Sequence, residues 1–180
     1  MNFMVMTNRQ NQHRFEELLR EHRKIIFKVV AIYARAAADR NDLEQEICVQ
    51  LWRSFDSYDE ERARFSTWMY RIALNVAISK LRRDRKWLAG RIESLDDVHL
   101  DTIASDEPIS EENDRLEMLY TLIGRLDPLN RAVILLYLEG RTYAEIADII
   151  GISETNVATK INRIKQKLRG AVTTAETVGG

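Results

Sequence analysis

The chain is poor in the residues that make crosslinks and turns. It has one cysteine, two prolines and seven glycines in 180 residues. A single cysteine, Cys48, excludes an internal disulfide and fits a reducing compartment. The scarcity of glycine and proline favours helices over turn-rich sheet. No run of 18 apolar residues occurs, and the start MNFMVMTNRQNQHRF lacks a basic segment before a hydrophobic core. We therefore expect no membrane-spanning helix, no signal peptide and a cytoplasmic location.

Patterns typical of cofactor or metal chemistry are also missing. His13, His22 and His99 have no metal-ligand spacing with Cys48, and His22 lies on an apolar helical stripe, where we expect it to pack. The phosphate-binding pattern GxxxxGK[ST] does not occur. The carboxylates of DLEQE fall on different helix faces, which disfavours a nucleic-acid enzyme. We therefore expect no catalytic residue, no cofactor and no metal.

The net charge of −1 conceals a segregation of charge along the chain. Residues 1–87 carry 17 Lys and Arg against 12 Asp and Glu, residues 88–114 carry 1 against 9, and residues 115–180 carry 9 against 7. Two mildly basic blocks therefore flank an acidic connector. Nucleic-acid binding needs a local positive surface rather than a positive total, so the overall charge does not exclude it.

The segment Thr142–Arg169, TYAEIADIIGISETNVATKINRIKQKLR, is the most informative stretch. Thr142 and Glu145 form a capping box, which predicts the start of a short helix. Gly151 ends that helix, and Ser153 is a good N-cap for a second one. Only three residues, Gly151 to Ser153, are left for the turn between the two helices. Two helices joined in this way form a helix-turn-helix, a motif that places side chains in the major groove of DNA.

The second helix of this motif has two contrasting faces. One is an apolar stripe that we expect to be buried, formed by Val157, Ile161, Ile164 and Leu168. The other carries groups suited to bases and phosphates, namely Thr155, Asn156, Thr159, Lys160, Arg163 and Gln166. We assign Thr155, Asn156 and Thr159 to base edges, and Lys160, Arg163 and Lys167 mainly to the phosphate backbone. The alternative is an ordinary surface helix of an all-helical domain.

Apolar periodicity predicts an all-α fold of two small helical domains. The first domain, 12–87, contains helices over Arg14–Ala36, from about Arg40 to Phe55, and from a cap at Ser66 or Thr67 to about Lys86. An acidic segment without sustained period, 88–112, is expected to be a flexible linker. The second domain, 113–170, contains the helix-turn-helix, and we expect the tail 171–180 to be frayed.

Local signals also predict where the second domain's other helix begins and ends. Asp127 followed by Pro128 is typical of an N-cap and first helical position, and Gly140 closes the helix just before the capping box.

Two helices of the first domain carry faces that core packing alone does not explain. On DLEQEICVQLWRSF, polar groups surround Val49 and Trp52 on the side away from Ile47, as at a docking surface. The alternative, equally favoured by the periodicity, is that Trp52 packs on the preceding helix. The third helix interleaves aromatic and basic residues, a combination that suits single-stranded or opened nucleic acid. A solvated basic helix end is its alternative.

Taken together, these blocks resemble an extracytoplasmic-function (ECF) sigma factor of the sigma-70 family over about residues 12–87 and 112–169. DLEQEICVQLW is similar to the family's region 2.2, and RFSTWMYRIALNVAISKLRRDRK to its regions 2.3 and 2.4. LDPLNRAVILLYLEGRTYAEIADIIGISETNVATKINRIKQKLR is similar to region 4. The order and spacing of the three blocks are more specific than any one of them. The family's recognition helix usually begins with more basic residues than Glu154, Thr155 and Asn156.

The resemblance implies roles for residues of both domains. Docking on the clamp helices of the polymerase β′ subunit would involve Asp42, Gln45, Glu46, Leu51 and Trp52. The minus-ten element would be held by the loop Asp56–Arg64 and by Trp68, Tyr70, Asn75, Lys80, Arg82 and Arg83. The minus-thirty-five element would be read by Thr155, Asn156, Thr159, Lys160 and Arg163.

The function implied is that of a non-enzymatic, dissociable initiation subunit. It would direct core RNA polymerase to specific promoters and assist promoter opening, with β′ clamp helices, β flap and promoter DNA as partners. In this group an anti-sigma factor commonly masks both domains. The alternative is a conventional helix-turn-helix regulator, which binds duplex DNA without docking on core polymerase and does not need Trp52 or the third-helix aromatics.

Overall fold

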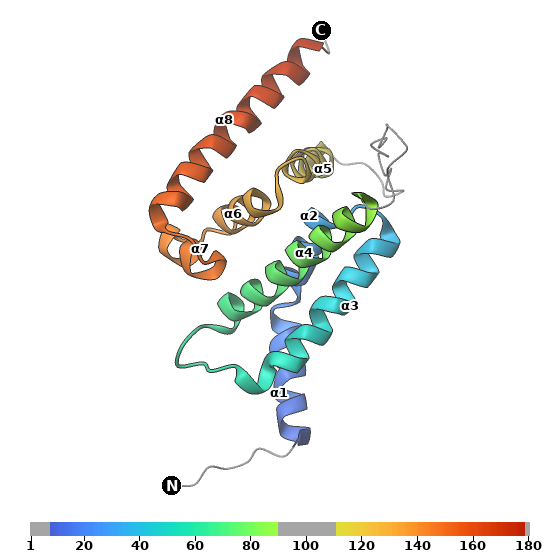
Figure 1. The fold of residues 1–180 in the computed structure, drawn as a ribbon, viewed down its shortest axis with the longest axis vertical. Helices are drawn as coiled ribbons and strands as arrows, with labels where there is room; N and C mark the ends of the chain where they lie inside the picture. Colours follow the sequence, from blue (N-terminus) through green and yellow to red (C-terminus); the bar gives the residue numbers. More distant parts are fainter. Residues whose placement is uncertain (1–7, 90–110, 179–180) are drawn as a thin grey trace.

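The computed structural model describes residues 8–89 and 111–178, and within these ranges every regular element is a helix. The elements are α1 (Asn8–Glu21), α2 (Arg23–Tyr33), α3 (Ala37–Ser54), the short 3-10 helix η1 (Phe55–Ser57), α4 (Phe65–Ala89), α5 (Glu111–Gly124), α6 (Pro128–Leu138), α7 (Tyr143–Ile150) and α8 (Glu154–Val178). The all-α prediction is confirmed. Figure 1 shows α1 and the end of α8 at opposite ends of the long axis. Most of the predicted linker lies outside the described residues.

The first group of helices forms a bundle of α2, α3 and α4, with each of the three packed on the other two. Its centre is fully buried and aliphatic, formed mainly by Val29, Leu43, Ile47, Leu51, Met69 and Ala73. These positions recur at helical spacing on their own elements, so burying one stripe from each helix removes the apolar surface from water. The polar sides of α3 and α4 remain outside and are available for contacts.

The predicted helix over Arg14–Ala36 is wrong as one element, because it is broken at His22. This residue has φ −103° and ψ 11°, which separates α1 from α2. Phe15 of α1 packs on Phe55 with ring centroids 5.1 Å apart. The His22 ring lies 5.4 Å from that of Phe65, which agrees with the packed histidine expected from the sequence. The break lets α1 reach the end of α3 while α2 packs along α4 (Figure 1).

The third helix begins earlier than the sequence indicates. α4 starts at Phe65, so Ser66 and Thr67 lie in its first turn and are not its caps. Thr67 is buried, and the amide nitrogens of Thr67 and Trp68 donate to the Arg64 carbonyl. An early start places Phe65 in the core, where its burial stabilises the first turn.

α6 begins and ends where its local signals predict. The Asp127 side chain accepts a 3.0 Å hydrogen bond from the Asn130 amide and caps α6, whose first residue is Pro128. Gly140, beyond the end of α6, has a φ of 72°. α6, α7 and α8 pack on one another around Leu136, Ile146 and Ile161, and α5 packs on α6.

The helix-turn-helix is confirmed in detail. Both halves of the capping box are present: the Glu145 amide donates to Thr142 Oγ1 at 3.2 Å, and the Thr142 amide donates to the Glu145 carboxylate at 2.8 Å. Gly151 has φ 81° and ψ 39°, a left-handed conformation that favours glycine. Ser153 Oγ accepts from the Asn156 amide at 3.2 Å and caps α8. α8 then continues to Val178, past the residue at which we expected the frayed tail to begin.

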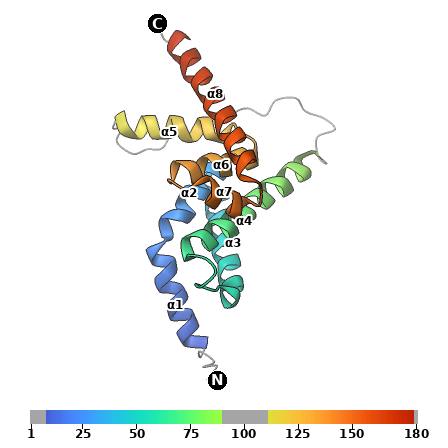
Figure 2. The same cartoon turned by 90° about the vertical axis from the view of Figure 1, so that its left-hand side faces the viewer.

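The two groups of helices are in contact. α2 and α4 pack against α5, α6 and α7, and Figure 2 shows α6 and α7 close to the α2 and α4 bundle from a second direction. No helix among the described residues is long and apolar enough to span a membrane. The residue ranges that we assign to the two domains stay a prediction.

Candidate nucleic-acid and partner interfaces

α3 presents a polar surface with two apolar residues in it. Asp42 and Gln45 are exposed, and Glu46 is half-buried in an ion pair with Arg83 of α4. Leu51, which we included in the docking set, is fully buried and can support that surface only from below. This ion pair connects the docking set on α3 with the minus-ten set on α4.

Trp52 both packs on a neighbouring helix and stays partly exposed, as the two alternatives left open by the sequence require. Its ring lies 5.2 Å from that of Phe15 on α1, yet 41% of the residue is exposed. Val49, one turn earlier on α3, is 48% exposed. An aromatic side chain held on one face and open on the other is preorganised, so less conformational entropy is lost when a partner covers it.

An aromatic cluster joins the loop after η1 to the start of α4. Trp68 is half-buried, and its ring centroid lies 5.1 Å from Tyr58 and 5.2 Å from Phe65. Phe55 packs edge-on against Trp68 at 6.3 Å. Tyr58 comes from the loop Asp56–Arg64, so this loop is anchored to α4 by ring contacts. Trp68 is only partly buried in this cluster, and an indole ring is a group on which an unpaired base can stack.

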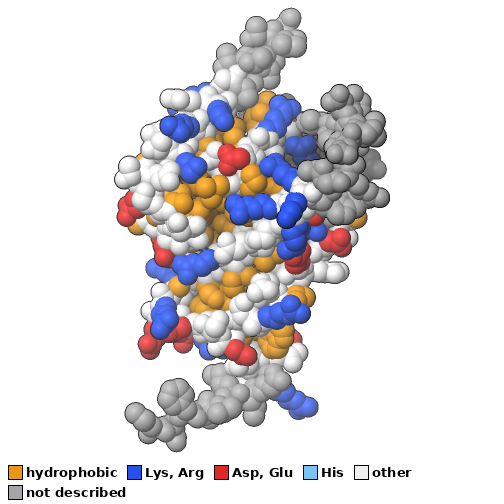
Figure 3. All heavy atoms as spheres, viewed as in Figure 1, with side chains coloured by type: hydrophobic (Ala, Val, Ile, Leu, Met, Phe, Trp, Pro, Cys, Tyr) orange, Lys and Arg blue, Asp and Glu red, His pale blue; other side chains and the backbone are white. Residues whose placement is uncertain are grey.

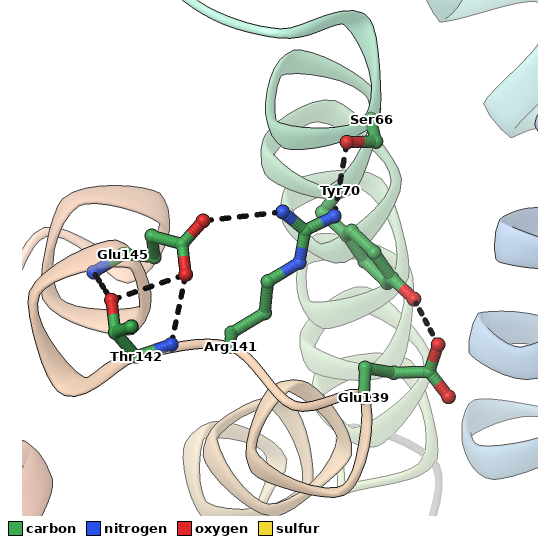
Figure 4. A network of polar contacts seen from close by, with 6 residues as sticks. All are labelled: Ser66, Tyr70, Glu139, Arg141, Thr142 and Glu145. Carbon is green, nitrogen blue, oxygen red and sulfur yellow. Dashed lines mark hydrogen bonds and ion pairs between the residues drawn. The ribbon is translucent and has the colours of Figure 1, made fainter.

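Tyr70 differs from its neighbours because it is almost completely covered. Its exposed fraction is 1%, and its hydroxyl donates to Glu139 at 3.2 Å (Figure 4). Burial raises the pKa of Tyr70, and the charge of Glu139 raises it further, so the hydroxyl stays a donor. The Arg141 guanidinium lies 5.5 Å from the centroid of the Tyr70 ring. In this conformation Tyr70 is not accessible to DNA, and its assigned minus-ten role stays a prediction.

The remaining minus-ten candidates follow the outer side of α4. Asn75, Arg82 and Arg83 are exposed, and Lys80 is half-buried. Asn75 and Arg83 line a groove of about 300 Å³ between α3 and α4, together with Glu46, Gln50, Ile72, Val76 and Ser79. On the face shown in Figure 3, basic side chains are scattered over the molecule with apolar side chains exposed between them.

The recognition face of α8 is open to solvent. Thr155, Asn156, Thr159 and Arg163 are exposed, and Lys160 is half-buried with its amine 3.4 Å from Asn130 Oδ1. The opposite stripe is buried as predicted, with Val157, Ile161 and Ile164 at most 1% exposed and Leu168 half-buried. The Thr159 hydroxyl donates to the Thr155 carbonyl at 2.9 Å, a bond that a base edge would compete for.

Several residues that the sequence analysis did not single out lie where the two groups of helices meet. Lys28 and Tyr33 of α2 and Asp148 of α7 make polar contacts across this boundary, as does Glu139. Their contacts join positions far apart in the chain, for which neither spacing nor periodicity gives a signal.

Comparison with protein families matches both parts of the chain. Residues 18–87 match the model described as sigma-70 region 2, and residues 116–168 match the model described as sigma-70 region 4. The matched segments contain α2 to most of α4 and most of α5 to α8, respectively.

Curated proteins resemble the chain over most of its length. RNA polymerase sigma factor CnrH of Cupriavidus metallidurans is 32% identical over 166 residues, covering 88% of this chain and 86% of the relative. The ECF RNA polymerase sigma-E factor of Haemophilus influenzae is 31% identical over 156 residues, covering 81% and 82%. ECF RNA polymerase sigma factor SigW of Bacillus subtilis is 25% identical over 167 residues, covering 88% and 89%.

Solved structures share the fold. A structure of CnrH in complex with the cytosolic domain of CnrY matches with a TM-score of 0.64 and 21% identity, covering 91% of this chain and 90% of that one. A structure of the sigma factor RpoE in complex with the anti-sigma factor NepR from Bartonella quintana matches with a TM-score of 0.68 and 17% identity, covering 88% and 95%.

Proposed function

The chain belongs to the extracytoplasmic-function group of the sigma-70 family and is an alternative sigma factor of RNA polymerase, and we propose that its two domains read the two halves of a promoter. One domain, built on α2 to α4, docks on core polymerase and holds the minus-ten element. The other, built on α6 to α8, reads the minus-thirty-five element. The observation that carries this proposal is the open polar face of α8 in a fully capped helix-turn-helix.

Docking uses the exposed side of α3. Trp52 and Val49 supply apolar area, and Asp42, Gln45 and Glu46 form a polar surround suited to the clamp helices of β′. The preformed Phe15 contact supports an anchoring role for Trp52. The domain built on α6 to α8 would attach separately to the β flap. The two attachments together would fix the distance between the two DNA-binding domains. Two weak DNA contacts then act together through their effective concentration.

Promoter opening uses the aromatic cluster and the cations of α4. Trp68, supported by Tyr58 and Phe65, offers a stacking surface for an unpaired base of the non-template strand. Lys80, Arg82 and Arg83 neutralise the adjacent phosphates. The energy for opening comes from binding the unpaired strand, so the protein acts without catalysing a reaction of its own. Because its target is polymerase, we place it in the cytoplasm, under the control of an anti-sigma factor.

The decisive experiment is transcription by bacterial core polymerase on a pool of genomic fragments, with and without the full chain, followed by mapping of transcript 5′ ends. We expect new start sites that share upstream sequence at two positions. A variant with Thr155, Asn156 and Thr159 replaced by alanine is the matched control, because it should still bind core polymerase but lose these start sites. A protein that binds duplex DNA tightly alone and never stimulates core polymerase is a conventional regulator, and that result would reject the proposal.

A further inference from the structure

The side of α8 that faces away from its domain carries a row of uncharged polar side chains, which we call the polar stripe. Its members are four, three and four residues apart, so at about 100° per residue they fall within an arc of about 60°. All of them are exposed, namely Thr155, Thr159, Asn162 and Gln166. The arc lies opposite the buried residues through which α8 packs on α6 and α7. Figure 1 shows α8 at the outer edge of the molecule.

Cations lie on both sides of the polar stripe. Helical spacing places Lys160, Arg163 and Lys167 along one flank, and Lys165 and Arg169 along the other. A surface helix mixes charged and polar residues on its solvent face. A helix in the major groove has instead uncharged hydrogen-bonding groups over the base edges and cations beside the two phosphate backbones. The distribution of charge around α8 favours this second arrangement.

The side chains of the stripe become longer from its start to its end. Thr155 and Thr159 carry short hydroxyl side chains, Asn162 carries an amide, and Gln166 carries an amide on one further methylene. The N-terminal part of a recognition helix lies deepest in the groove, so a later position needs a longer side chain to reach a base edge. The order of the side chains on α8 meets this requirement over about three turns.

The two amides of the stripe are available for a bound base. Among the described residues, neither the Asn162 nor the Gln166 side chain has a hydrogen-bond partner. The Thr159 hydroxyl differs, because it already donates to the Thr155 carbonyl at 2.9 Å. An amide presents a donor beside an acceptor, and this pair matches the N7 acceptor and the N6 donor on the major-groove edge of adenine.

The spacing of the two amides also fits the spacing of bases. Asn162 and Gln166 lie four residues apart, which is a rise of about 6 Å along α8. Successive base pairs of duplex DNA rise by about 3.4 Å. A helix that lies along the groove therefore brings the two amides opposite bases about two steps apart.

We propose that Asn162 and Gln166 are further specificity-determining residues, and that each reads one adenine of the minus-thirty-five element, the two adenines lying about two base pairs apart. This inference rests on the proposed function, because it takes α8 as the reader of that element. It extends the base-reading surface beyond the residues that the family resemblance implies, and it assigns a base to each added residue.

The test uses the full chain in complex with bacterial core polymerase. The holoenzyme selects from a promoter library that is randomised over the minus-thirty-five region, and the bound DNA is sequenced. We expect adenine to be enriched about tenfold or more at two positions about two base pairs apart. Asn162→Ala should abolish the enrichment at one position and Gln166→Ala at the other. Both residues are exposed and alanine favours helices, so both variants should fold.

Lys167→Gln is the matched control on the same helix, because it changes an exposed residue of the flank. It should weaken binding to all sequences alike and leave both adenine preferences unchanged.

A second measurement separates contact by an amide from recognition of duplex shape. In a selected promoter, each of the two adenines is replaced in turn by 7-deazaadenine, which pairs normally but lacks the N7 acceptor. Each replacement should weaken binding of the parent holoenzyme about tenfold. The alanine variant of the residue that reads this base should show no further loss, because the bond is already absent.

Two outcomes would overturn the inference. One is the absence of adenine enrichment at such a pair of positions, and the other is enrichment that persists in both alanine variants or is insensitive to 7-deazaadenine, as expected for readout of shape. A full chain that brings core polymerase to no member of the library is a different result, since it overturns the proposed function and this inference with it.

Discussion

Among single residues, Trp52 has the clearest division between a structural and a binding role. One side of its ring rests on Phe15, and 41% of the residue is exposed. We predict that Trp52→Ala weakens core-polymerase binding about tenfold or more, since truncating a central aromatic anchor commonly costs about 2 kcal/mol. Binding is measured by titration of core polymerase with labelled protein, alongside urea unfolding to separate lost packing from lost docking.

The control for Trp52 is Phe27→Ala. Phe27 is 44% exposed on α2, with the Arg23 guanidinium 4.7 Å from its ring centroid, and lies outside the proposed docking surface. The substitution Phe27→Ala removes a ring about as exposed as that of Trp52, and it should leave the affinity for polymerase unchanged. Equal losses in both variants, or none in Trp52→Ala, would reject the docking role.

The recognition residues divide into those that read bases and those that hold phosphates. We predict that Asn156→Ala alters which upstream sequences the holoenzyme selects, because an amide can bond two positions on one base edge. Arg163→Gln should instead weaken promoter binding on all sequences alike and lower the slope of log affinity against log salt by about 1. Competition binding of holoenzyme to promoter variants over a salt series distinguishes the two. A change of sequence preference in Arg163→Gln would contradict this division.

At the scale of elements, α7 depends on its capping box. We predict that Thr142→Ala destabilises the second domain by about 1 kcal/mol, since the Glu145 amide loses its acceptor. Helix loss in urea, followed by circular dichroism, measures this. Ser153→Ala, which removes the cap of α8, is the comparison and should cost a similar amount.

The capping box also predicts a dependence on pH. Hydrogen bonds from the Thr142 backbone and side chain hold the pKa of the Glu145 carboxyl below its usual range. A lowered folded-state pKa stabilises the native state above the unfolded pKa of about 4.3, and this contribution is lost as pH falls through the lowered value. Glu145→Gln should therefore be less stable than the parent at neutral pH, with a difference that shrinks in acid. A difference that is constant with pH would contradict this explanation.

These elements also show what a sequence can predict. The caps at Thr142, Asp127 and Ser153 act over three residues, so their signals are contained in short segments that can be read directly. The break at His22 gives no such signal, because apolar periodicity continues past it and histidine does not interrupt helices. It arises from tertiary packing, as α1 and α2 contact different partners.

The candidate site shows the same limit. Helical periodicity placed Asp42, Gln45 and Asn156 correctly on exposed faces. It did not predict the burial of Tyr70, whose hydroxyl donates to Glu139, a residue 69 positions away. Contacts over such separations depend on how two domains meet, and no local pattern encodes that arrangement.

At the scale of the whole molecule, opposite charges meet where the domains join. Lys28 and Arg71 belong to a first half with an excess of basic residues, and their partners Glu139 and Asp148 belong to the second domain. The chain's overall charge of −1 gives no sign of this pairing. The cations that pair with the second domain are distinct from Lys80, Arg82 and Arg83, which we assign to phosphates, so contact between the domains leaves the proposed phosphate-binding cations unpaired with it.

The two interdomain ion pairs nevertheless differ in what they contribute. Their lengths are similar, 2.6 Å for Lys28 with Glu139 and 2.8 Å for Arg71 with Asp148, but the second pair is 40% and 67% exposed. Exposed pairs contribute about 0–1 kcal/mol, because water screens them and ordering two side chains costs entropy. We therefore predict that Asp148→Asn lowers the free energy of unfolding by at most about 1 kcal/mol, and by less than Glu139→Gln does. Urea unfolding followed by circular dichroism measures both losses, and a larger loss in Asp148→Asn would show that the exposed pair contributes more than the pair with Glu139.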